Sequence, residues 1–122
     1  MAVIAPTIVP VGNMDGSIVR VTWTPVIETD TCAPASLPEF ADKSIQVFGS
    51  FGGTSVALHG SNDGGTTFAA LNIPAGTAIA ITTTSIKQVL ENTEQIKPVL
   101  TGGTSTSISV VVLCRLANPL RT

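Results

Sequence analysis

The side chains of this sequence that could carry out chemistry are few and lie far apart. His59 is the sole histidine, and a general base also needs a nucleophile or an acid held beside it. Asp63 follows closely enough to pair with His59, but such a pair alone often arises by chance. Cys32 and Cys114 are the only thiols, and with one histidine they cannot supply the ligands of a zinc site. We therefore expect no enzymatic activity, no bound metal and no cofactor.

The two cysteines are expected to be reduced thiols in the core. Cys114 directly follows the apolar run 110–113, where a free thiol behaves as a small hydrophobic side chain. The long separation from Cys32 allows one disulfide but does not demand it, so a single bridge is the alternative.

The sharpest motif is the run 61–68, which fits the pattern Ser-x-Asp-x-Gly-x-Thr-aromatic known as an Asp-box. Its structural residues are Ser61, Asp63, Gly64, Gly65, Thr67 and Phe68. The carboxylate can accept hydrogen bonds from backbone amides of the turn, and the two glycines can adopt the positive φ that a hairpin reversal needs. The aromatic ring is expected to fold back toward the sheet. The motif therefore predicts a stable β-hairpin and no chemistry.

The elements that position this turn are predicted to be short strands. Charged residues make up 11% of the chain, against about 25% in typical proteins, and Val, Ile and Thr dominate the alternating segments. Alternation or turn signals predict strands over 17–27, 44–51, the approach to residue 61, 66–71, 77–82, 95–100 and 105–116. The pattern indicates one all-β domain over residues 1–122, an antiparallel β-sandwich of jelly-roll-like type.

Two segments depart from the alternating pattern. Residues 28–42 contain two prolines and no periodicity, which predicts a long loop. Ile86, Val89 and Leu90 have the i, i+3, i+4 spacing of a helix, so at most one short helix is expected near residues 85–92.

The N-terminal residues 1–16 are apolar but interrupted by prolines, which predicts an extended arm or an edge strand. Such an arm could add to a neighbour's sheet. Low charge favours a chain that buries surface against other molecules, and we expect self-association, with a trimer slightly favoured over a dimer. The candidate contact residues are the exposed apolar side chains Val3, Ile4, Ile8, Val9, Val11, Leu37, Phe40 and Leu120.

The charge pattern argues against nucleic-acid and membrane partners. The formal net charge is −2, and the six cations are scattered: Arg20, Lys43, Lys87, Lys97, Arg115 and Arg121. Phosphate binding would need a concentrated basic patch. No segment reaches the roughly 18 apolar residues of a membrane span. Residues 1–6 lack the basic region of a signal peptide, so we expect the protein to be made and kept in a cytoplasm.

The segment 44–115 resembles small structural proteins of tailed bacteriophages. The likeness rests on the strand 45–49 leading into 56–66, on 89–92, on 96–103 and on the final strand into 113–115. It spans 72 of the 122 residues, and the N-terminal third has no such counterpart. In size the chain is similar to capsid decoration (cement) proteins with jelly-roll-like folds.

This resemblance implies a structural role in the virion. A decoration protein binds the outer face of the capsid at junctions between major capsid proteins and is synthesised in the cytoplasm of the bacterial host. The partners implied are the major capsid protein and further copies of the chain. Two alternatives stay open: a component of the phage tail or head–tail connector, and a carbohydrate- or host-binding module. The second would need aromatic platforms, and Trp23 is the lone tryptophan.

Overall fold

The computed structural model describes residues 2–12 and 17–116 of the chain. The strands in these ranges are β1 (Val3–Ile4), β2 (Thr7–Pro10), β3 (Ile18–Val26), β4 (Thr31–Cys32), β5 (Ala35–Ser36), β6 (Phe40–Ser50), β7 (Ser55–Ser61), β8 (Ala69–Ala70), β9 (Ser85–Val89), β10 (Gln95–Thr101) and β11 (Ser107–Leu116). No helix occurs among the described residues. The prediction of an all-β fold is confirmed.

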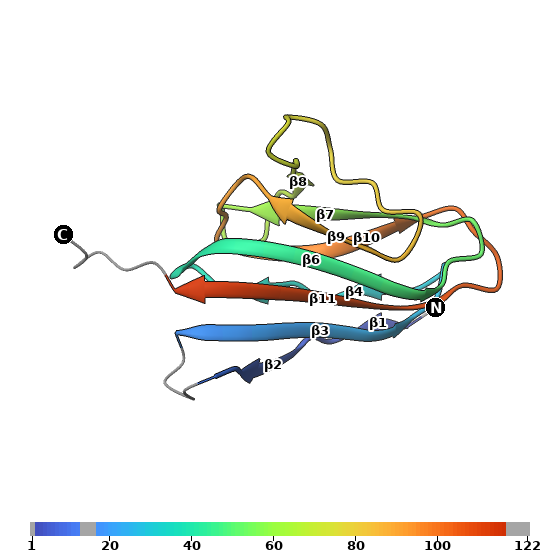
Figure 1. The fold of residues 1–122 in the computed structure, drawn as a ribbon, viewed down its shortest axis with the longest axis horizontal. Coiled ribbons are helices and arrows are strands. Elements are labelled where there is room, and N and C mark those ends of the chain that lie inside the picture. The colour runs from blue at the N-terminus through green and yellow to red at the C-terminus, as the bar shows by residue number, and fades with distance from the viewer. Residues whose placement is uncertain (1, 13–16, 117–122) are drawn as a thin grey trace.

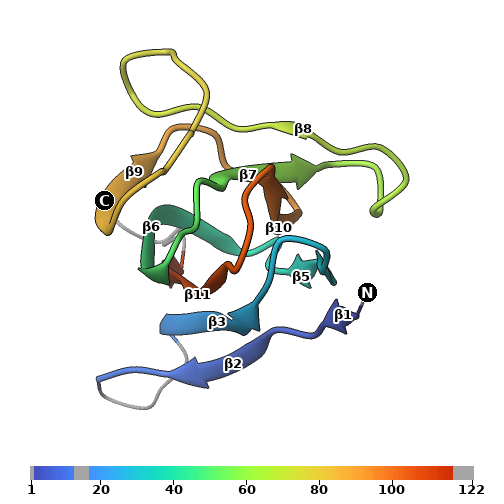
Figure 2. The same cartoon turned by 90° about the vertical axis from the view of Figure 1, so that its right-hand side faces the viewer.

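The strands form two larger antiparallel sheets and one small parallel pair (Figure 1). The five-stranded sheet has the order β2-β3-β11-β6-β9, and the four-stranded sheet has the order β5-β10-β7-β8. β1 pairs with β4 in parallel, Val3 with Thr31 and Ile4 with Cys32. Figure 2 shows β9, β6 and β11 on one side and β7, β10 and β5 on the other.

The core lies between the inner faces of the two larger sheets. The alternation of β3 buries Val19, Val21 and Trp23, while Arg20 and Thr24 face outward, as the sequence predicted. The Trp23 indole Nε1–H donates to the Ala33 carbonyl at 2.8 Å, so its polar atom is satisfied inside the core. The buried side chains of both sheets form one continuous cluster. The sandwich-like arrangement is therefore confirmed, and jelly-roll connectivity stays a prediction.

The helical interpretation of residues 85–92 is wrong. Residues 85–89 form β9, which pairs antiparallel with β6, Ile86 opposite Gln46 and Val89 opposite Lys43. Only Val89 of the three apolar residues turns inward and is buried, while Ile86 and Leu90 are exposed. The i, i+3, i+4 spacing of apolar residues is misleading here, because an edge strand can leave an apolar side chain such as Ile86 exposed to solvent.

Three other boundaries differ from the sequence expectations. The predicted loop 28–42 contains β4, β5 and the start of β6. β4 and β5 are formed by pairing with strands that are remote in sequence, and two residues are too few to show the alternation of a strand. The predicted strand 66–71 contracts to β8. The segment 77–82 forms only the isolated bridges of Ala78 with Asn72 and of Ile81 with Val56.

Candidate functional site

The Asp63 turn between β7 and β8 is a closed polar network. Asp63 Oδ1 accepts hydrogen bonds from the Ser61 hydroxyl at 2.7 Å and from the amides of Thr66 at 3.1 Å and Thr67 at 2.9 Å. Gly65 N–H donates to the Ser61 hydroxyl oxygen at 3.1 Å. The Ser61 hydroxyl and the Thr67 amide hold the pKa of Asp63 down, to about 2. The predicted acceptor role of Asp63 is confirmed.

The glycines and the aromatic residue of the motif also behave as predicted. Gly64 and Gly65 have φ of 77° and 91°, the left-handed region that a tight reversal requires. The Phe68 ring is half-buried and folds back over the four-stranded sheet, where Lys97 Nζ of β10 lies 4.4 Å from the ring centroid.

One residue outside the motif, Glu94, anchors the turn, and sequence reasoning missed it. Gly64 N–H donates to Glu94 Oε1 at 2.9 Å, and Glu94 N–H donates to Asn62 Oδ1 at 2.9 Å. These bonds join the turn to the link between β9 and β10, about thirty residues further along. No local pattern around Glu94 signals the contact, because it depends on the packing of the two sheets.

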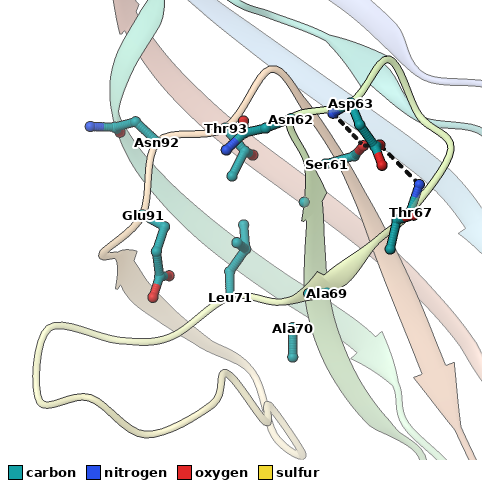
Figure 3. A pocket seen from close by; sticks show the side chains of 11 residues that line it. Ser61, Asn62, Asp63, Thr67, Ala69, Ala70, Leu71, Glu91, Asn92 and Thr93 are labelled. Atoms are coloured by element: carbon teal, nitrogen blue, oxygen red, sulfur yellow. Dashed lines mark hydrogen bonds between the residues drawn. The ribbon is translucent and has the colours of Figure 1, made fainter.

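A hollow of about 710 Å³ lies beside this turn (Figure 3). It is bordered by the Asp63 turn, by residues 69–71 and by the link 91–93. Its second carboxylate, Glu91, accepts from Asn72 N–H at 2.7 Å and from Asn72 Nδ2 at 2.6 Å, and these donors lower its pKa. Both carboxylates of the hollow are therefore engaged by the protein itself. The Ser61 hydroxyl lies beside the Asp63 carboxylate, but a carboxylate with a pKa of about 2 is a weak base for activating it.

His59 does not join this network. It is half-buried on β7, on the face opposite Val56 and Leu58, and its neighbour across the sheet is Lys97 of β10. Burial and the nearby ammonium lower its pKa, which disfavours the charged form. The hydrogen bonds of Asp63 all go to the turn, so the structure does not bring the two together as a catalytic pair.

The cysteines are free and buried, as the sequence predicted. Burial raises the pKa of both thiols to about 11, which makes them poor nucleophiles. Lys43, the cross-strand neighbour of Cys114, is also buried, and its Nζ donates to the carbonyls of Phe40 at 2.9 Å and Ala41 at 3.2 Å. No group of three or more His, Cys, Asp or Glu side chains within the described residues could hold a metal ion.

Strand pairing and the Asp30 carboxylate fix the N-terminal segment to the rest of the domain. Asp30 Oδ1 accepts from Ala2 N–H at 3.0 Å, and the parallel pairing of β1 with β4 continues with Ala33 N–H donating to the Ile4 carbonyl at 2.9 Å. Ile4 packs against the core. Val3, in contrast, is 70% exposed, and Ile8 of β2 is 46% exposed. The segment is thus a docked edge that displays some of its apolar side chains.

The free edge of β2 offers almost no backbone donors. Val11 N–H donates to the Ile18 carbonyl, so the amides of odd-numbered residues point toward β3 and those of even-numbered residues point away. Ile8 then carries the single outward N–H between Pro6 and Pro10, because proline has none. A strand ladder on this edge would lack the donors of both prolines, which disfavours strand addition here. Addition of the arm to a neighbour's sheet stays a prediction.

The other candidate contact residues differ in their exposure. Leu37 is 4% exposed and belongs to the core, so its prediction as a surface contact is wrong. Phe40 and Val11 are half-buried, and Phe40 packs against the core cluster. Val9 is 38% exposed. Leu120 lies outside the described residues.

Comparisons with known proteins add no identification. No protein-family model, no curated protein and no solved structure matches this chain. Within the described residues, no helix has the length and apolar character needed to cross a membrane.

Proposed function

We propose that this chain is a non-enzymatic structural protein of a tailed bacteriophage that binds the outer face of the capsid and reinforces contacts between major capsid proteins. It is made in the cytoplasm of the bacterial host and acts without metal, cofactor, nucleic acid or membrane. The proposal rests on the resemblance of residues 44–115 to phage structural proteins and on the character of the surface.

The observation that carries the proposal is the N-terminal edge. Val3 and Ile8 expose apolar side chains, although β1 and β2 are fixed to the body by strand pairing and by Asp30. Ordering such side chains on a rigid support before binding reduces the entropy that association costs. An exposed apolar side chain at a prepositioned edge is what a contact with a preformed capsid surface requires.

The body behind this edge suits a mechanical role. Its polar networks are closed, as at Asp63 and Glu91, and no buried side-chain polar atom among the described residues lacks a hydrogen-bond partner. A fully satisfied polar network stabilises one arrangement of the chain. Because Pro6 and Pro10 remove two donors from the free edge of β2, the proposed contact with the capsid relies on side chains.

The first test is the copy number in the particle. Quantitative mass spectrometry of purified particles of the phage that encodes the chain should find hundreds of copies, since a decoration protein occupies repeated lattice positions. A few copies per particle would instead favour the tail or connector, and absence from the particle would refute the proposal.

The second test places the contact. Heads stripped of the protein are incubated with wild type, Val3→Asp or Ile8→Asp and sedimented. We expect both variants to fold normally, because neither side chain is buried, and to lose most of the binding. Leu90→Asp is the control and should bind as wild type does, because Leu90 is also exposed and follows β9, at the opposite edge of the five-stranded sheet from β2. Wild-type binding by both edge variants would refute this docking surface.

A further inference from the structure

The Asp63 turn contains an Asp-Gly pair, Asp63–Gly64, and the sequence has one other, Asp15–Gly16, which lies outside the described residues. An aspartate followed by glycine is prone to rearrange, because glycine has no Cβ to hinder attack by its own amide nitrogen on the aspartate side chain. The pair in the turn is therefore a chemically reactive peptide as well as a folding device.

The rearrangement has two steps, and its only co-reactant is water. The Gly64 amide nitrogen loses its proton and bonds to the side-chain carboxyl carbon of Asp63. The hydroxyl group of the protonated carboxyl leaves, so one water molecule is expelled and a five-membered succinimide ring closes. A water molecule then opens the ring at either carbonyl, which restores aspartate or leaves isoaspartate, with the backbone running through the former side chain.

The nucleophile of this reaction is held by Glu94. Gly64 N–H donates to Glu94 Oε1 at 2.9 Å, so the proton that the reaction must remove is bound to a carboxylate oxygen. Hydrogen bonds to ionised acceptors are among the stronger ones in proteins. The amide of Gly64 is therefore kept in its protonated, unreactive form.

The electrophile is held by the turn itself. Asp63 Oδ1 accepts hydrogen bonds from the Ser61 hydroxyl and from two backbone amides of the turn, at 2.7 to 3.1 Å. Ring closure expels a carboxyl oxygen as water, which requires the protonated carboxyl group. These donors favour the ionised form and hold the pKa of Asp63 at about 2. They also fix the direction of the side chain.

Glu94 is fixed opposite Gly64 by its own backbone. Its N–H donates to Asn62 Oδ1 at 2.9 Å, and its carbonyl accepts from Leu37 N–H at 2.8 Å. Leu37 belongs to the core, so the second bond ties Glu94 to a buried segment of the domain. The fold therefore positions this carboxylate before the reaction could begin.

The surroundings of Gly64 leave room for the second step. A Cβ on Gly64 would meet no atom within 4 Å, whereas a Cβ on Gly65 would lie 2.7 Å from Gln95 Oε1. Gly64 is also exposed, so water can reach the site of ring opening. Isoaspartate lengthens the backbone by one methylene group and shortens the side chain by one. The carboxylate would then be displaced from the amides that it now accepts from.

We propose that Asp63–Gly64 is a site of isoaspartate formation in this chain and that the Glu94 carboxylate suppresses the reaction in the folded protein. Loss of the Gly64 amide proton places a negative nitrogen beside this carboxylate, which is unfavourable. The succinimide nitrogen carries no hydrogen, so ring closure also sacrifices the bond to Glu94. The reaction depends on the turn alone and is independent of capsid binding.

The test is peptide mapping of the full chain after prolonged incubation at neutral pH. Trypsin places the two Asp-Gly pairs on separate peptides, residues 1–20 and 44–87, and electron-transfer fragmentation distinguishes isoaspartate from aspartate. We expect Asp63 to react readily in urea and slowly in the folded wild type. Glu94→Ala should react about tenfold faster than wild type, because a hydrogen bond to a charged acceptor is lost. Glu94→Gln keeps an oxygen acceptor without the charge and should lie between the two.

Two control variants separate this local effect from others, and circular dichroism establishes that every variant is folded. Val112→Ala destabilises the core of the other large sheet and controls for global unfolding. Glu39→Ala removes an exposed carboxylate elsewhere. A rise confined to the Glu94 variants supports the proposal.

Four results would overturn the proposal. The first is an Asp63 that forms no isoaspartate in urea, and the second is a folded wild type that reacts as fast as the unfolded chain. The third is an equal rise in Val112→Ala, which would make the protection a property of the whole fold. The fourth is an unchanged or lower rate in Glu94→Ala, and a lower rate would show that Glu94 removes the Gly64 proton as a base.

Discussion

The Asp63 turn and the outward side of β11, which carries Val111 and Leu113, differ in how their side chains are used. In the turn, the carboxylate, the hydroxyl and the amides satisfy one another, and Glu94 and Asn62 tie the turn to the link between β9 and β10. On the outward side of β11, Val111 and Leu113 meet no second layer of the protein. The turn attracts attention as a sequence motif, yet its polar groups are occupied by folding. Val111 and Leu113 belong to no sequence motif, yet their side chains lie on a surface that the fold leaves uncovered.

The comparison shows that the functional groups of a side chain do not by themselves indicate whether it is free to contact another molecule. Asp63 is solvent-exposed, but its Oδ1 already accepts hydrogen bonds from three donors of the turn. Val111 can form no hydrogen bond, but its half-exposed side chain can still lose water to a partner at about 25 cal/mol per Å² of apolar surface. Variants that separate folding from association therefore test the comparison directly.

The largest expected effect comes from the two sides of β11. Val112→Ala should destabilise the fold by about 2–3 kcal/mol, because it removes fully buried methyl groups and leaves a cavity. Val111→Ala should cost less than about 1 kcal/mol in the monomer, because its site is half-exposed. Urea unfolding of both variants at low protein concentration measures the difference through the transition midpoint. Equal losses at the two positions would show that the outer side chain is also part of the core.

The next effect concerns the turn. Asp63→Ala should lower Tm by a few degrees, less than Val112→Ala does, because two turn amides and the Ser61 hydroxyl lose their acceptor. Binding to stripped heads should not change. Glu39→Ala, at another exposed carboxylate, serves as the control for removal of a negative charge. A variant that melts like wild type but no longer associates would make Asp63 a binding residue.

The pH dependence of the turn is a smaller effect with a defined sign. The folded pKa of Asp63 is about 2, below the ordinary 3.8, so its contribution to stability is complete above about pH 4. That contribution is lost as pH falls from about 4 toward 2, where the carboxylate protonates in both states. The Tm difference between wild type and Asp63→Ala should therefore shrink over this interval. A difference that stays constant from pH 6 to pH 2 would contradict the assigned role.

Much of the sandwich could be predicted because alternation is a local signal. A strand such as β3 carries it over nine residues, so the inward side chains Val21 and Trp23 could be identified from the sequence. The turn could be predicted for the same reason, since Asp63 and its donors lie within a few residues. Local sequence suffices where the interaction partners are local.

The rest depended on remote partners. β4 is two residues long and exists because β1 lies beside it, and the Asp30 carboxylate reaches back 28 residues to Ala2. β9 is a strand because β6 offers it an edge, although the spacing of Ile86 and Val89 suits a helix. The outward side of β11 could not be recognised from the apolar run alone, because a run of this kind does not show which side of the strand a second sheet covers.

The smallest expected effect is a reaction that should hardly occur in the folded protein. Cys114 on the inner side of β11 is fully buried with its pKa raised to about 11, and Cys32 is buried with the same pKa. A thiol reagent at pH 8 should therefore label neither thiol until the chain is unfolded, and then label both. Ser107→Cys adds an exposed thiol to the outer side of the same strand and should react at once, which calibrates the reagent. Rapid labelling of Cys114 in the native protein would mean that the inner side of β11 opens to solvent. The two sides of the strand would then differ only in how often they are exposed to solvent.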